Sequence, residues 1–185
     1  MSGAMTGLTI EPITVIDTPR LRLRTVTPDD AAFYLALVNE PSWIAHIGQR
    51  NLHTVEAARA ALESGAMAQF RQHGYAFCIV ERRSDGVAMG ICGLILRASL
   101  PGPDIGYALL PAYWGQGYAW EAAAAVMRHA QHVLRLPTVY GITSQQNQAS
   151  INLLNKLGLR FERFARLPPD GKDTNVYRRD FRQHG

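Results

Sequence analysis

The sequence contains little cysteine, which excludes a small fold held together by disulfide bonds. Cys78 and Cys92 are the only 2 cysteines among the 185 residues, and their spacing matches no metal-binding or redox motif. Both stand in apolar stretches of the kind that form strands. We therefore expect buried, reduced thiols, no metal site and a cytoplasmic location.

The sequence also lacks long hydrophobic runs. Residues 105–120 and 136–155 carry no charge, but Gly and Pro interrupt the first stretch and polar amides and hydroxyls fill the second. Neither is typical of a membrane span, so we expect no membrane partner. Residues 1–12 show no basic stretch followed by an apolar core, so we expect no secretory signal there. We expect a flexible leader over residues 1–16 and one domain over residues 17–185.

Acidic residues are missing from one long part of the chain. No Asp or Glu lies between Glu121 and Glu162, whereas four basic residues do: Arg128, Arg135, Lys156 and Arg160. The chain has 19 basic and 15 acidic residues in all, so the net charge of +4 falls entirely within this stretch. Such a local excess favours an acidic ligand. No basic run exceeds two residues and no nucleic-acid-binding motif occurs, so nucleic acid is not an expected partner.

Hydrophobic periodicity predicts a chain that mixes helices and strands. Strands are expected at residues 20–26, 75–81, 87–97, 104–110, 138–143, 159–166 and 175–181. Helices are expected at residues 27–38, 54–72, about 114–134 and from 147 or 149 to 158, with a loop or short helix at 43–47. Hairpins around one strand–helix–strand crossover predict an α/β (α+β mixed) fold. Its twisted, mostly antiparallel mixed sheet should have about six or seven strands and about four flanking helices.

A glycine-rich turn is the sharpest motif. Gly115, Gly117 and Ala119 stand at alternate positions between a predicted strand and a predicted helix, where backbone N–H groups can converge on a phosphate. A P-loop is excluded because no Gly-Lys-Ser/Thr follows. A dinucleotide-binding turn is disfavoured because Trp120 is bulky and no acid follows about 20 residues later. The pyrophosphate of coenzyme A is the remaining candidate.

Three segments then carry a family resemblance. Residues 105–122, IGYALLPAYWGQGYAWEA, resemble motif A of the GNAT (Gcn5-related) N-acetyltransferases, and most of all the RimJ/RimL-type branch. Residues 147–158, NQASINLLNKLG, resemble the second motif of that family, and residues 18–24, TPRLRLR, resemble the opening of the branch. Trp114 stands where the wider family often has Gln or Arg. The likeness extends over about residues 17–182.

The resemblance implies direct transfer of an acetyl group from acetyl-CoA to a primary amine, either a protein N-terminal α-amine or a small-molecule amine. It also implies a strand at 104–110 that diverges from the strand at 138–143, with the donor lying in the gap and a backbone N–H of that strand serving the acetyl oxygen. The implied donor-binding residues are Tyr107, Ala108, Leu109, Trp114, Gly115, Gln116, Gly117, Tyr118, Ala119, Trp120, Asn147, Asn152 and Lys156. Asn147 could instead only cap a helix, and Asn152 could be a solvated surface residue.

The catalytic groups follow from the same resemblance. Ser150 stands where the branch places a general acid for the leaving thiolate, although a helix-capping role is the alternative. Asp104 is a candidate general base, with Glu40 and His46 as further candidates. An α-amine of pKa near 8 is about one-tenth neutral at pH 7, whereas a lysine amine is neutral at only about one part in 2,500. The lack of an obvious base therefore favours an α-amine or another amine of low pKa as the acceptor, and does not exclude lysine.

The acceptor side is less specific. Trp43, Ile44, His46 and Tyr113 are candidates for the acceptor pocket, although such aromatic residues are more often core. The chain could act as a monomer or a homodimer. A non-catalytic module that binds or senses acyl-CoA is the alternative function.

Overall fold

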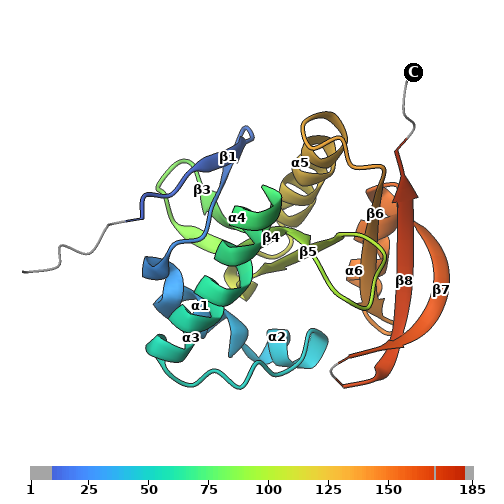
Figure 1. Cartoon of the computed structure of the whole chain (residues 1–185), viewed down its shortest axis with the longest axis horizontal. Helices are drawn as coiled ribbons and strands as arrows, with labels where there is room; N and C mark the ends of the chain where they lie inside the picture. The colour runs from blue at the N-terminus through green and yellow to red at the C-terminus, as the bar shows by residue number, and fades with distance from the viewer. Residues whose placement is uncertain (1–9, 169, 182–185) are drawn as a thin grey trace, which may run out of the picture.

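The computed structural model describes residues 10–168 and 170–181, which form one sheet with helices on both faces (Figure 1). The strands are β1 (Thr14–Asp17), β2 (Leu21–Arg24), β3 (Phe77–Arg82), β4 (Ala88–Ile95), β5 (Asp104–Leu109), β6 (Thr138–Ser144), β7 (Arg160–Leu167) and β8 (Lys172–Asp180). The α-helices are α1 (Ala31–Val38), α2 (Pro41–His46), α3 (Val55–Leu62), α4 (Ala68–His73), α5 (Tyr118–His132) and α6 (Gln148–Lys156). Short 3₁₀ turns at Pro28–Asp30 and Pro111–Tyr113 and a π-helical turn at Glu63–Met67 complete the described elements.

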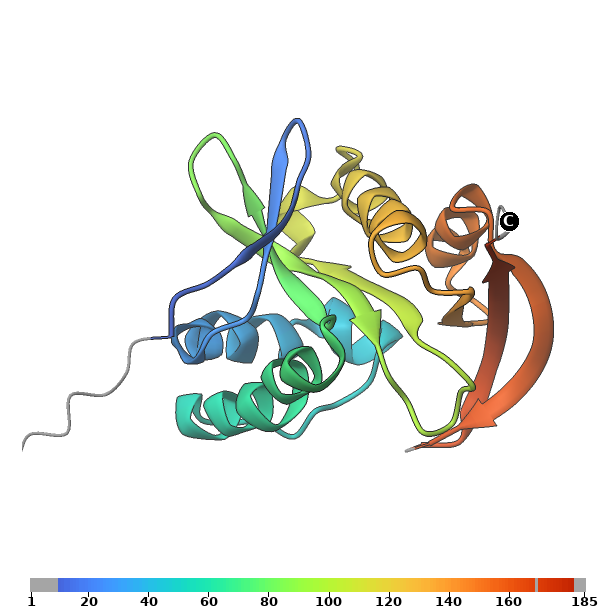
Figure 2. The same cartoon turned by 45° about the horizontal axis from the view of Figure 1, so that its top comes forward.

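The sheet has the strand order β1-β2-β3-β4-β5-β6-β8-β7. Every neighbouring pair is antiparallel except β5 and β6. Figure 2 shows α1, α3 and α4 on one face of the sheet and α5 and α6 on the other. The predicted mixed, mostly antiparallel α/β fold is therefore confirmed.

Three local expectations need correction. The strand β1 was not expected, and it includes residues 14–16 of the predicted leader, because Thr14–Asp17 pairs with β2. Residues 1–9 of that leader lie outside the described residues. The sheet has eight strands rather than six or seven. The loop or short helix expected at 43–47 is the short helix α2. The single helix expected over 54–72 is divided by the π-helical turn.

Helix ends follow local sequence signals. Thr54 caps α3, since its side chain accepts the Ala57 N–H at 3.1 Å. Thr27 and Asp30 form a capping box before α1, in which Asp30 accepts the Thr27 N–H at 2.8 Å. Gly74 ends α4 in the left-handed region at φ 76°, where a side chain would be strained.

The core has two main parts, one on each face of the sheet. The larger part packs α5 and α6 against the sheet and contains Cys78 and Cys92, which are cross-strand neighbours on β3 and β4. Both thiols are free and buried, as expected, and burial raises the pKa of the Cys78 thiol to about 12. The second part packs α1, α3 and the turn after α3 against β3 and β4. Among the described helices, none is long and apolar enough to cross a membrane.

One opening in the sheet prepares the functional site. The parallel strands β5 and β6 pair at a single position, Asp104 with Tyr140. The Tyr140 N–H donates to the carbonyl of Pro103 at 2.9 Å, just before this position. Beyond it the two strands diverge, so the edge of β5 from residue 105 to residue 109 faces a gap rather than another strand.

Candidate active site

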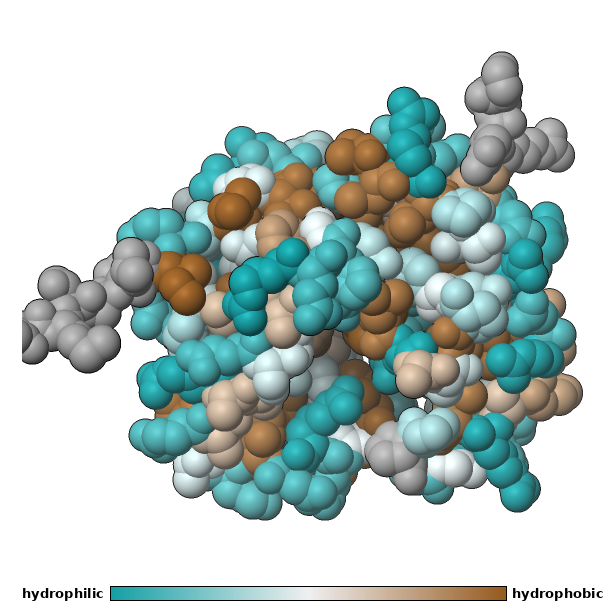
Figure 3. All heavy atoms as spheres, viewed as in Figure 1, coloured by the Kyte–Doolittle hydropathy of each residue, from teal (hydrophilic) through white to brown (hydrophobic). Residues whose placement is uncertain are grey.

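A cavity of about 1050 Å³ opens where β5 and β6 diverge. Its walls come from α2 and the loop after it, from β5, from the turn at 114–120, from the start of α6 and from the hairpin between β7 and β8. Figure 3 shows the molecular surface hollowed between the α2 side and the β7–β8 side. The cavity is thus bounded by segments that are far apart in the sequence.

The glycine-rich turn lies at one end of this cavity, at the start of α5. Gly115 and Gly117 take the left-handed conformation at φ 72° and 80°, which explains why glycine occupies both positions. Gly117 is the N-cap of α5, and the first intrahelical bond runs from the Glu121 N–H to the Gly117 carbonyl. The N–H groups of residues 118–120 therefore have no partner in their helix. Together with the positive end of the helix dipole they suit a phosphate group.

A network behind this turn holds it against β2. The Arg20 side chain donates from Nε to Glu121 Oε2 at 2.6 Å and from Nη1 to the Gln116 carbonyl at 3.0 Å. Its guanidinium carbon also lies 4.3 Å from the centre of the Tyr118 ring. Glu121 in turn accepts from the Thr18 hydroxyl at 2.7 Å. These contacts lower the pKa of Glu121 despite its partial burial, so the carboxylate stays ionised.

The free edge of β5 offers hydrogen-bond donors to the gap. The Leu110 N–H donates to Met89 on β4 at 2.8 Å, and strand N–H groups alternate in direction. The N–H groups of Tyr107 and Leu109 consequently point into the gap, whereas that of Ala108 points toward β4. At the C-terminal end of β5, Trp114 Nε1 donates to the Leu109 carbonyl at 2.9 Å. Two of the three predicted backbone positions thus face the gap, and Ala108 meets the cavity through its side chain alone.

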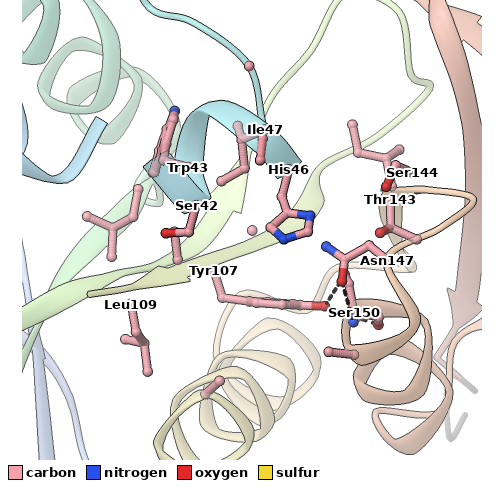
Figure 4. Close-up of a pocket in the computed structure, with 18 of the residues that line it drawn as sticks. Ser42, Trp43, His46, Ile47, Tyr107, Leu109, Thr143, Ser144, Asn147 and Ser150 are labelled. Carbon is pink, nitrogen blue, oxygen red and sulfur yellow. Dashed lines mark hydrogen bonds between the residues drawn. The ribbon is translucent and has the colours of Figure 1, made fainter. Parts of the chain in front are cut away.

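Ser150 and Asn147 lie across the gap from β5, at the start of α6. The Tyr107 hydroxyl is 2.8 Å from Ser150 Oγ. Asn147 caps α6, since its Oδ1 accepts the Ser150 N–H at 3.2 Å. All three side chains line the cavity, and Figure 4 shows them converging from β5 and α6. Asn147 therefore caps the helix, which was the alternative to a donor-binding role, and it also lines the cavity.

Asp104 lies at the point where β5 and β6 meet and is 1% exposed. Its Oδ1 accepts from Arg97 Nε at 2.9 Å. Burial raises the pKa of Asp104, and the charge and hydrogen bond of Arg97 oppose that rise. The carboxylate borders the cavity, but one oxygen is already engaged by a cation.

The acceptor-side candidates line the opposite part of the cavity. Trp43 is buried on α2, whereas Ile44 is half-buried and His46 is exposed at the end of that helix. The His46 ring reaches toward Tyr107 and Asn147 (Figure 4). Tyr113 also lines the cavity, and so does Glu40 just before α2.

Three predicted donor-binding residues do not line the cavity. Gln116 is exposed, and its side-chain Nε2 donates to the Ala112 carbonyl at 3.2 Å. Asn152 is exposed on α6 and accepts from Gln148 at 2.7 Å. Lys156 is also exposed, but its Nζ lies 4.3 Å from the centre of the Trp120 ring, which does line the cavity. Of the two that lie on α6, Lys156 is therefore the one that contacts the turn.

The local excess of positive charge is only partly at the site. Arg135 follows the far end of α5, so the 15-residue helix separates it from the glycine-rich turn by roughly 20 Å at 1.5 Å per residue. Arg128 is exposed on α5 and Arg160 begins β7. Lys156 lies against Trp120 in the turn, whereas Arg135 lies beyond the opposite end of α5.

The structure also brings in residues that the sequence did not single out. Arg97 and the hairpin residues Leu167, Pro168, Asp170, Lys172, Asp173 and Thr174 line the cavity. Arg20 and Glu121 support the turn from outside it. The quoted segments do contain Arg20 and Glu121, but the pairing of residues 101 positions apart is visible only in the fold. No periodic or motif signal marks the hairpin residues.

The fold and the cavity together fit an acyl-CoA-dependent transferase. A model of the acetyltransferase (GNAT) domain matches residues 20–160. The chain belongs to the GNAT acetyltransferase family and is an acetyl-CoA-dependent acyltransferase. The unpaired amides of the turn and the open edge of β5 suit the phosphate and amide groups of that donor.

Known relatives agree with this family. The chain is 29% identical over 168 residues to an uncharacterized N-acetyltransferase, YoaA, of Bacillus subtilis (strain 168), covering 88% of this chain and 94% of YoaA. It resembles the crystal structure of an acetyltransferase from Agrobacterium tumefaciens with TM-score 0.75, 23% identity and coverage of 95% and 96%. It also resembles RimL, a ribosomal L7/L12 alpha-N-protein acetyltransferase solved with coenzyme A, with TM-score 0.76, 17% identity and coverage of 91% and 98%. The predicted likeness to the RimJ/RimL-type branch is thus confirmed at the level of the fold.

Metal ligands do not gather in this site. Across residues 10–168 and 170–181, no three His, Cys, Asp or Glu side chains come together as a possible ion site.

Proposed function

We propose that the protein transfers an acetyl group from acetyl-CoA to a primary amine by direct attack, and that the acceptor is an α-amine, on a protein N-terminus or on a small molecule. The observation that carries the proposal is the cavity that joins the glycine-rich turn to the acceptor-side residues of α2. When bound, acetyl-CoA supplies an activated acetyl group as a thioester. The turn binds the phosphates of the donor, and the gap-facing N–H groups of β5 hold the acetyl oxygen.

Ser150 holds the proton for the leaving thiolate. It lies on the first turn of α6, beside the open edge of β5, and Asn147 and Tyr107 fix its backbone and hydroxyl. This placement lets its hydroxyl face the donor sulfur, which a surface capping serine would not do. A positioned general acid contributes typically 10²–10⁴-fold to a rate.

His46 is the better candidate for the proton acceptor. Asp104 was the first sequence candidate, but its carboxylate is almost fully buried and paired with Arg97. The His46 side chain is exposed to the cavity and directed toward Tyr107 and Asn147 (Figure 4). Imidazole is the commonest general base of enzymes at neutral pH. Asp104 then keeps Arg97 in place at the junction of β5 and β6.

The choice of an α-amine rests on acidity and on the site. An α-amine is already partly neutral at pH 7 and needs only a weak base, whereas a lysine amine needs about 3–4 kcal/mol more help, at 1.36 kcal/mol for each pKa unit. The buried carboxylate at the site is already paired, so strong base catalysis is not what the cavity offers. RimL, whose fold this chain shares, is by its name an alpha-N-protein acetyltransferase.

We also propose a cytoplasmic location. Cys78 and Cys92 are cross-strand neighbours and yet are free thiols, which fits a reducing compartment.

The test compares two matched peptides of the same sequence. One has a free α-amine and acetylated lysines, and the other has an acetylated N-terminus and free lysines. Release of free coenzyme A thiol from acetyl-CoA is measured with each peptide, and with amino acids and polyamines. We expect turnover with α-amines to exceed that with lysine amines at pH 7. Binding of coenzyme A without turnover on any amine would contradict the proposal and favour an acyl-CoA-binding module.

A further inference from the structure

The hydroxyl groups of Tyr107 and Ser150 form a pair that bridges the opening between β5 and α6. Their oxygens are 2.8 Å apart, and the Tyr107 oxygen also lies 3.4 Å from the Ser150 carbonyl oxygen. Tyr107 is half-buried, and its ring packs against the larger part of the core. The hydroxyl of Tyr107 is therefore held in place by its ring on one side and by α6 on the other.

The direction of this hydrogen bond follows from the chemistry of the two groups. Burial raises the pKa of Tyr107 to about 12, so its phenol keeps its proton at neutral pH. A phenol is more acidic than an aliphatic alcohol and is the better donor of the two, whereas a serine oxygen can accept twice. The Ser150 carbonyl can only accept and competes for the single Tyr107 hydrogen, but it is the more distant acceptor, at 3.4 Å against 2.8 Å for Ser150 Oγ. Tyr107 therefore donates to Ser150 Oγ and leaves the Ser150 hydrogen free.

We infer that Tyr107 is a positioning residue for acetyl transfer, which aims the hydroxyl hydrogen of Ser150 into the cavity at the sulfur of the donor. This inference rests on the role proposed above for Ser150. A serine on a helix otherwise tends to donate to a backbone carbonyl of the preceding turn. Because Ser150 Oγ accepts the Tyr107 hydrogen, its own hydroxyl hydrogen points away from Tyr107.

The proton balance of the step is complete with the groups named. The carbon–sulfur bond breaks with its electron pair on sulfur, and the sulfur takes the Ser150 hydroxyl proton. The hydrogen bond from Tyr107 stabilises the negative charge that develops on Ser150 Oγ. The attacking amine loses one proton to His46, and that proton returns to Ser150 through water. Tyr107 carries its own proton at the start and at the end of the step, so it is not consumed.

The first experiment is a double-mutant cycle with Tyr107→Phe and Ser150→Ala. We expect Tyr107→Phe to lower kcat about tenfold and Ser150→Ala to lower it about 100-fold, within the range for a general acid. The double variant should be no slower than Ser150→Ala, because Tyr107 acts through Ser150. Tyr75→Phe is the matched control, since burial also raises the pKa of Tyr75 but its side chain lies outside this cavity. Effects that multiply in the double variant would overturn the inference.

The second experiment separates a proton-positioning role from a structural one. Acetylpantetheine and S-acetylthiophenol are compared as donors, because thiophenolate is a weak base that leaves without a proton. Tyr107→Phe should slow transfer from acetylpantetheine about tenfold and leave transfer from S-acetylthiophenol unchanged, since it removes only help to a leaving group that needs a proton. Equal slowing with both donors, or wild-type rates with both, would overturn the inference. Absence of turnover in the wild-type chain with every amine would instead overturn the proposed function and the inference with it.

Discussion

Arg20 and Glu121 connect the start of β2 to the first turn of α5 through an ion pair of 2.6 Å. The same guanidinium donates to the Gln116 carbonyl inside the glycine-rich turn, and the Arg20 N–H donates to Glu121 Oε1 at 2.9 Å. The turn is therefore held from behind by a strand that contributes nothing to the cavity walls. Two of the three family-like segments of the sequence meet at this point.

We predict that Arg20→Ala weakens coenzyme A binding about three- to tenfold, because the turn loses the support that fixes its amides. Arg22→Ala is the matched control. Arg22 lies two residues further along, on β2, is equally exposed and pairs with Asp17 instead. Isothermal titration with coenzyme A measures both variants. Equal affinity in the two would show that the support is not needed.

We predict that Gly117→Ala reduces coenzyme A affinity beyond any effect on folding. A Cβ at this position meets a left-handed backbone and lies 3.4 Å from Arg20 Nη2, and the strain amounts to roughly 1–2 kcal/mol. Gly74→Ala carries similar backbone strain at the end of α4 with open space around it, so it reports the cost to stability alone. Melting temperatures should fall in both variants, and binding should fall only in Gly117→Ala.

We predict that His46→Ala lowers kcat about 100-fold for an α-amine acceptor, as the loss of a general base does, and leaves KM for acetyl-CoA nearly unchanged. His53→Ala, an exposed histidine outside the cavity, is the control. If Asp104→Asn lowered kcat about 100-fold and His46→Ala did not, Asp104 would be the base.

We predict that Arg97→Ala destabilises the fold by about 2–4 kcal/mol at pH 7, because it leaves the buried Asp104 carboxylate without its cation. Burial raises the pKa of Asp104, so between its ordinary and raised pKa the folded chain binds more protons than the unfolded chain. The free energy of unfolding of the variant should therefore recover as the pH falls from 7 toward 5. Urea unfolding at both pH values measures this recovery.

Two further variants serve as controls for that measurement. The double variant Arg97→Ala/Asp104→Asn should lose most of the pH dependence. Arg166→Ala breaks the exposed Arg166–Asp173 pair and should change stability little at either pH. A deficit in Arg97→Ala that is the same at pH 5 and pH 7 would contradict the assignment to Asp104.

We predict that Lys156→Ala raises KM for acetyl-CoA roughly fivefold and affects acetyl-dephospho-CoA less, because a cation beside the Trp120 ring is placed to meet a phosphate. Arg128→Ala, which removes a charge from the exposed middle of α5, should leave both values unchanged. Steady-state kinetics with the two donors tests the pair. Equal effects of Lys156→Ala on both donors would show that Lys156 does not contact the phosphate that acetyl-dephospho-CoA lacks.

Much of the fold could be predicted from the sequence because its signals are local. Alternation of apolar residues marked seven strands. The glycine-rich turn marked the start of a helix, which begins at Tyr118 rather than at about residue 114. The strand β1 was missed because Thr14–Asp17 has only four residues and no fully buried position. The π-helical turn after α3 interrupts no hydrophobic pattern, so the sequence predicted one continuous helix there.

The site was predictable where it rests on a contiguous motif and not where it depends on pairing across the fold. The turn at Gly115 and Gly117 and the position of Ser150 were found from spacing and resemblance. The bond from Tyr107 to Ser150 joins residues 43 positions apart, and no periodic pattern reports such a pair. Net charge does not locate the site by itself, because Arg135 belongs to the basic stretch of the sequence but follows the end of α5 that is opposite the turn.

Because β5 and β6 pair only at Asp104 and Tyr140, a single position connects strands β1–β5 of the sheet to strands β6–β8. A donor lying along the edge of β5 would take the place of the strand that is absent there, so bound substrate becomes part of the scaffold. We therefore expect hydrogen exchange in β6, β7, β8 and α6 to be faster than in β2–β5 for the free chain and to slow toward the same rate when coenzyme A is bound. Loss of the donor would then loosen one half of the protein before the other.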